Sequence, residues 1–121
     1  IYTTALPPSV YASIDAAIEI IPNLNKERKN LFENSKFVRT KLNSLNIDTG
    51  NTHSQIIPII LKNEKRCLEL QQCLKNSGFF VKVIKSPTVL KGTERIRLSL
   101  TSSMEKKTLR KFIQAMKDYF K

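Results

Sequence analysis

The apolar positions of this chain repeat with a helical period in four segments and follow a strand pattern in three. A proline pair at residues 7–8 opens the first helical segment, which is expected to end before Pro22. Asn23 or Asn25 is expected to cap a second helix that runs to about Leu45. On the first predicted helix the apolar residues form one stripe, made of Val10, Ile14, Ala17, Ile18 and Ile21. On the second the apolar stripe is made of Leu24, Leu31, Val38, Leu42 and Leu45.

The three strand patterns lie in the second half of the chain, after a polar, turn-rich loop. The β-branched run 55–61 predicts the first strand, and Pro58 within it favours an edge position or an outward-facing proline nitrogen. Residues 79–84 and 95–100 predict two more strands, separated by a loop. A third helix is expected from Glu64 to an Asn-Ser-Gly stop signal.

A last helix is predicted after residues 102–105, which read as a capping box. Its inner face is expected to consist of Leu109, Phe112, Ile113, Met116 and Phe120. The element order predicts an α/β or α+β domain, with a small, mostly antiparallel sheet of about three strands covered by helices on one side. At 121 residues the chain is long enough for one domain with a modest core and too short for two.

Composition and charge narrow the function classes. A net charge of +11 makes a polyanion the first partner to consider, but the lysines are scattered and the aromatic residues do not interleave with them. A basic nucleic-acid-binding module without catalysis therefore remains only an alternative. Cys67 and Cys73 match no zinc pattern and are expected to be free thiols of a reducing, cytoplasmic compartment. No apolar run approaches the roughly 20 residues of a membrane span.

The sequence offers little for nucleophilic or metal catalysis. His53 is the only histidine, and its place in a loop favours a solvated side chain. The three glycines are too far apart to form a phosphate-binding loop, and no metal-ligand cluster is present in the sequence. No catalytic residue and no metal ligand are therefore assigned.

Arg95 and Arg97 are the candidates for an anion site. They alternate with apolar residues, so a strand would place both guanidinium groups on one face, about 6.6 Å apart. A guanidinium stays charged and its planar fork matches a carboxylate. A pair of surface arginines, or an ion pair with Glu94 or Glu105, is the alternative. Thr88, in the loop before this strand, is placed to supply a hydroxyl.

Two segments resemble motifs of the α-oxoamine synthase family of pyridoxal-phosphate enzymes: YTTALPPSV at 2–10 and SPTVLKGTERIRLSL at 86–100. That family typically carries T-A/S-L/M-P-P after its cofactor lysine and P-P-T-V-P-x-G-T-x-R-L-R-x-S/T-L near its end. The run SQIIPIIL also resembles a family strand, and the match covers essentially the whole chain in order. Ser86 and Leu90 depart from the usual prolines, whereas Thr88 and Arg97 stay in register.

The resemblance implies roles for individual residues. It implies that Arg97 binds the carboxylate of an amino-acid substrate, that Thr88 lies beside it, and that Arg95 is structural. Thr3 and Thr4 fall on positions that, in the family, reach the phosphate of pyridoxal 5'-phosphate in the other subunit of a dimer. Before the resemblance is considered, those two threonines read as an ordinary helix start that could also receive an anion.

The resemblance also implies a place within a larger enzyme. Residues 1–121 would be the C-terminal small domain of a fold type I enzyme, with 1–22 as the segment and helix on the side of the large domain. The first helix is then expected to expose apolar surface that the large domain and partner subunit cover. The cofactor lysine would lie upstream of this chain, so that the chain alone is expected to be inactive.

The implied activity is a decarboxylative condensation of an amino acid with an acyl thioester, catalysed by a cytoplasmic homodimer. The wording T-V-x-x-G-T favours the family member that joins L-alanine to a pimeloyl thioester, carried by coenzyme A or acyl carrier protein, in biotin biosynthesis. Sister enzymes that use glycine, namely glycine C-acetyltransferase and 5-aminolevulinate synthase, remain the alternative within the family.

Overall fold

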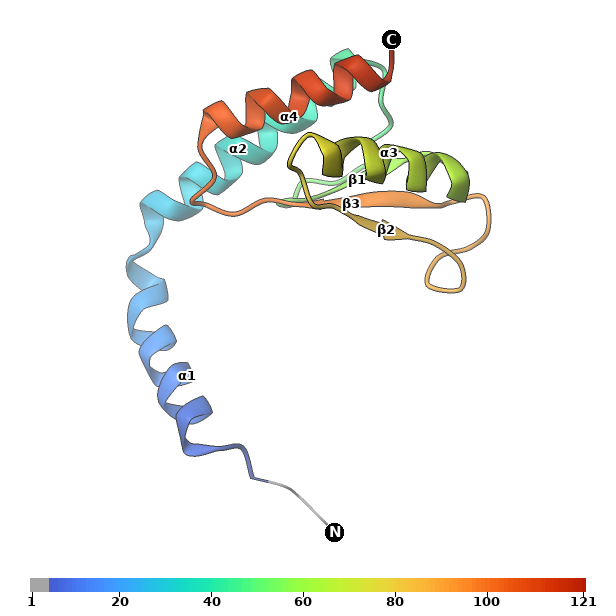
Figure 1. The fold of residues 1–121 in the computed structure, drawn as a ribbon. Coiled ribbons are helices and arrows are strands. Elements are labelled where there is room, and N and C mark those ends of the chain that lie inside the picture. Colours follow the sequence, from blue (N-terminus) through green and yellow to red (C-terminus); the bar gives the residue numbers. More distant parts are fainter. Residues whose placement is uncertain (1–4) are drawn as a thin grey trace.

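The computed structural model describes residues 5–121 and follows the element order that the sequence predicts (Figure 1). Two helices and a short 3₁₀ turn come first, and then strands and helices mix. The elements are α1 (Pro8–Ile20), the 3₁₀ turn η1 (Ile21–Asn23), α2 (Asn25–Ser44), β1 (Ile56–Ile60), α3 (Glu64–Asn76), β2 (Lys82–Ile84), β3 (Arg95–Ser99) and α4 (Lys106–Tyr119). The predicted α+β class is therefore confirmed.

The three strands form one antiparallel sheet in the order β1-β3-β2. Strand β1 lies at an edge, which confirms the position predicted from Pro58, since a proline has no backbone N–H to donate to a neighbouring strand. Strand β3 is central and pairs with both others. Strand β2 is shorter than the predicted segment 79–84.

Helices α2, α3 and α4 cover one face of the sheet and leave the other face bare (Figure 1). The covered face and the inner sides of these helices make a single core. Its fully buried side chains include Val38, Leu42, Ile57, Ile59, Leu70, Leu74, Ile96 and Met116. The strand alternation that buries Ile96 necessarily turns its neighbours in β3 to the bare face.

Helix α1 extends away from this body, and its main contacts are with η1 (Figure 1). It has no buried residue. The apolar stripe predicted from the sequence is exposed, at 45% for Ile14 and 64% for Ile18. The expected apolar surface is thus present, and the identity of what covers it stays a prediction.

Two predicted helix caps are wrong. Neither Asn23 nor Asn25 caps α2, because Leu24 occupies that position without a side-chain cap and Asn25 instead accepts a hydrogen bond from Arg28 at 3.0 Å. Helix α4 begins at Lys106, and no side chain caps it. The segment 101–104 forms a hydrogen-bonded turn instead, so the capping box predicted at residues 102–105 does not form.

Cys67 and Cys73 are both free, as predicted, but their surroundings differ. Cys67 is fully buried, and burial, followed by the nearby charge of Glu94, raises the pKa of its thiol. Cys73 is partly exposed. We expect iodoacetamide to alkylate Cys73 in the folded protein while sparing Cys67, because only an accessible thiolate reacts. Mass spectrometry of the digested protein, labelled with and without urea, measures this; equal labelling without urea would contradict it.

Candidate functional site

The bare face of the sheet is built by alternation along β3. Ile96 and Leu98 are buried against the helices, whereas Arg97 and Ser99 are exposed on the opposite side. Because β3 is central, Arg97 has a strand on each flank: Pro58 of β1 and Lys82 of β2 lie directly across from it. The sheet thus fixes the backbone position from which the Arg97 side chain projects, whereas an arginine on a loop has no such support.

The Arg97 side chain makes no hydrogen bond or ion pair with any residue in 5–121. It lines a shallow hollow of about 320 Å³ together with Phe80, Val81, Lys82 and Ser99. The alternative in which Arg97 pairs with Glu94 or Glu105 is therefore not realised in the described chain. All donors of its fork remain available to an incoming anion.

Arg95 is used differently from Arg97. It is half-buried, and its Nε donates a hydrogen bond to the carbonyl of Thr93 at 2.8 Å. Its strand neighbours are the apolar Ile60 and Ile84. Arg95 thus donates to the backbone of its own loop, and its structural role stays a prediction.

Glu94 holds the loop that precedes β3, a role that sequence reasoning missed. Its side chain is 5% exposed, and both carboxylate oxygens accept from the backbone N–H of Gly92 at 3.0 Å. Its carbonyl accepts from the N–H groups of Leu61 and Lys62 at 3.1 and 3.0 Å. Gly92 has φ of 85°, a conformation that other residues rarely adopt. A glutamate two residues after a turn glycine was the signal available in the sequence.

Thr88 lies in the loop between β2 and β3 and is exposed. Its N–H donates to the carbonyl of Lys85 at 2.9 Å, and Lys85 is itself ion-paired with Glu64 of α3. Thr88 is not among the residues that line the hollow at Arg97. The structure therefore anchors the loop but does not bring this hydroxyl into the hollow.

Of the sequence-predicted site residues within 5–121, only Arg97 lines this hollow. Thr3 and Thr4 lie outside the described residues. His53 is exposed in the loop before β1. Within residues 5–121, no group of three potential metal ligands comes together and no helix is long and apolar enough to cross a bilayer.

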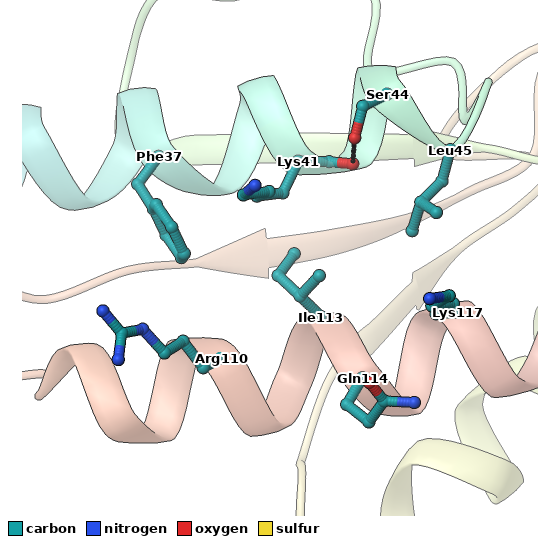
Figure 2. A pocket seen from close by; sticks show the side chains of 8 residues that line it. All are labelled: Phe37, Lys41, Ser44, Leu45, Arg110, Ile113, Gln114 and Lys117. Atoms are coloured by element: carbon teal, nitrogen blue, oxygen red, sulfur yellow. Dashed lines mark hydrogen bonds between the residues drawn. The ribbon is translucent and has the colours of Figure 1, made fainter.

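A second hollow, of about 520 Å³, lies between α2 and α4 (Figure 2). Its lining combines three cations, Lys41, Arg110 and Lys117, with apolar side chains from both helices. It belongs to the helical layer, on the other side of the sheet from Arg97 (Figure 1). Substitutions of these cations lie away from Arg97 and therefore provide controls for substitutions at Arg97.

Together these features define an α+β domain with helices on one face of its sheet. Within the described residues, the central strand presents the unpaired Arg97 on the other face. The chain belongs to the aminotransferase class I and II family, whose model matches residues 1–116. It is 40% identical over 102 residues to a Desulfosudis oleivorans protein provisionally named 8-amino-7-oxononanoate synthase, covering 84% of this chain and 26% of that relative. A protein of the same provisional name from Paramagnetospirillum magneticum is 38% identical over 118 residues, covering 98% of this chain and 30% of the relative. The chain thus spans between a quarter and a third of these relatives' length.

Solved structures repeat the fold. An 8-amino-7-oxononanoate synthase from Francisella tularensis superposes with a TM-score of 0.82 at 25% identity, covering 99% of this chain and 34% of that one. Serine palmitoyltransferase from Sphingomonas wittichii superposes with a TM-score of 0.89 at 24% identity, covering 98% and 30%. The second likeness concerns the fold alone.

Proposed function

We propose that this chain acts as the C-terminal small domain of an 8-amino-7-oxononanoate synthase, an α-oxoamine synthase. The reaction is the condensation of L-alanine with a pimeloyl thioester, with loss of carbon dioxide. The observation that carries the proposal is the unpaired, strand-borne Arg97, which lies within the segment 86–100 that resembles the family's motif. The names of the relatives and the likeness to the Francisella tularensis enzyme support the choice of this member of the family.

In this proposal Arg97 binds the carboxylate of L-alanine through its two-pronged fork. Two parallel charge-assisted hydrogen bonds fix the orientation of the carboxylate as well as its position. A fixed carboxylate determines which bond at the α-carbon is presented for reaction, and such orientation contributes several kcal/mol in general. Glu94 and Gly92 hold the loop before β3 and so keep the strand that carries Arg97 in place.

Pyridoxal phosphate, when bound, supplies the electron sink for the carbanion derived from the amino acid. Thr3 and Thr4 are proposed to bind its phosphate across a homodimer. The described residues fit the substrate side of such a site: Arg97 supplies an unpaired cation, whereas the glycines at 50, 78 and 92 are too dispersed to cradle a phosphate. The exposed stripe of α1 is proposed to pack against the large domain and the partner subunit.

The proposal is tested with the full-length protein that carries this chain, loaded with pyridoxal phosphate. We expect carbon dioxide to be released from carboxyl-labelled L-alanine only when pimeloyl-coenzyme A or pimeloyl-acyl carrier protein is supplied. The 121-residue chain alone is expected to release none. Faster release from glycine than from L-alanine would favour the decarboxylating sister enzyme, 5-aminolevulinate synthase, and no thioester-dependent release from either amino acid would contradict the proposal.

A further inference from the structure

Lys82 places a second cation directly beside Arg97. The two residues face each other across β2 and β3, and both are exposed on the bare face. Side chains directly opposite in an antiparallel pair have Cβ atoms about 4.5–5.5 Å apart. Like charges in that position destabilise the pairing, so the sheet carries a repulsion that an anion between them would relieve.

No carboxylate on the strands offsets this repulsion. The alternation and the register place eight strand residues on the bare face: Ile56, Pro58, Ile60, Lys82, Ile84, Arg95, Arg97 and Ser99. Three of them are cations and none is acidic. Lys82, like Arg97, makes no ion pair with residues 5–121, whereas nearby Lys85 is paired with Glu64.

The surroundings of the two cations suit a small ligand. Phe80, which is 86% exposed, and Val81 form an apolar wall of the hollow, and Ser99 adds a hydroxyl. The arginine offers a planar fork and the lysine a compact point charge, so that one negative group can occupy each. A ligand with a single carboxylate uses only one of the two positions.

We propose that Lys82 and Arg97 together form a site for a compact dianion, a small ligand with two adjacent negative charges. A dicarboxylate and an inorganic phosphate dianion share this chemistry. The proposal rests on the proposed function in one respect: if Arg97 holds the amino-acid carboxylate, a dianion that bridges both cations excludes the amino acid. Compact dianions then compete with L-alanine, and Lys82 is a residue that sets the selectivity of the site for anions.

Calorimetric titration of malonate, acetate and inorganic phosphate into the full-length protein tests the site without any amino acid. We expect malonate to bind at least about tenfold more tightly than acetate. Its second carboxylate can accept one more charge-assisted hydrogen bond, from Lys82, and a bond of that kind accounts for such a difference in affinity. Lys82→Gln is expected to remove this preference and to leave acetate binding within about twofold. If phosphate shows the same preference over acetate and the same dependence on Lys82 as malonate, the site recognises the double charge. If only malonate does, the site recognises two carboxylates. Both results support the site.

Lys41→Gln provides the matched control, since Lys41 is an exposed lysine of the hollow between α2 and α4 (Figure 2). It should retain the preference for malonate. Thermal unfolding gives a second measurement: malonate should raise the Tm of the wild type more than that of Lys82→Gln. Equal binding of malonate and acetate to the wild type, or a preference that survives Lys82→Gln, would overturn the dianion site. L-alanine binding that is insensitive to Arg97 would instead overturn the proposed function alone.

Discussion

Replacing Ile96 by alanine is expected to lower the free energy of unfolding by about 2–5 kcal/mol. Ile96 is fully buried at the centre of β3, where it lies opposite Ile59 of β1 and Val83 of β2. Truncation removes apolar contacts and leaves a cavity between the central strand and the helices, which a well-packed core fills only partly. Urea unfolding followed by circular dichroism measures the change.

Two variants of the same strand calibrate that result. Ile96→Val removes one methylene group and should cost about 0.5–1.5 kcal/mol. Ser99→Ala changes an exposed residue on the bare face and should stay within about 0.5 kcal/mol. If Ile96→Ala cost no more than Ser99→Ala, the two faces of β3 would be wrongly assigned, and the position of Arg97 with them.

Arg97→Lys is expected to weaken L-alanine binding by about tenfold to a hundredfold in the full-length protein. The substitution keeps the positive charge but loses the planar fork, so one of two charge-assisted hydrogen bonds to the carboxylate disappears. Such a bond contributes about 1.5–3 kcal/mol, which corresponds to that change in affinity. Titration of L-alanine, followed through the absorbance of the bound cofactor, measures the dissociation constant.

Arg110→Lys is the matched control for this prediction, because it makes the same chemical change on α4, in the hollow on the other side of the sheet (Figure 2). It should leave the dissociation constant for L-alanine unchanged. An equal effect of both substitutions would indicate a general influence of charge rather than a carboxylate grip at Arg97.

The order and class of the elements were predictable because the periodic spacing of apolar residues along the sequence is a strong local signal of secondary structure. Caps were less predictable, since they depend on contacts made after the chain has folded back. At the start of α2, Arg28 donates to the carbonyls of Ile21 and Pro22 at 2.7 and 3.1 Å. The same guanidinium also donates to Asn25 Oδ1, so this asparagine oxygen accepts from Arg28 and does not cap the N–H groups of α2.

The candidate site was predictable only in part. Strand alternation placed Arg95 and Arg97 on one face, and the structure confirms this arrangement. Lys82 could not be paired with Arg97 from the sequence, because the register of β2 against β3 depends on the loop between them. Glu94 was considered as an ion-pair partner, whereas the structure uses it to bind a backbone N–H within that loop.

The central claim, that Arg97 recognises the substrate carboxylate, is tested most directly by comparing L-alanine with L-alaninamide, which lacks the negative charge. The ratio of their dissociation constants would be measured for the full-length wild type and for Arg97→Lys. Our account predicts that the wild type binds L-alanine much more tightly than the amide, and that the ratio falls by about tenfold or more in the variant. An unchanged ratio would show that another group recognises the carboxylate and would contradict the account.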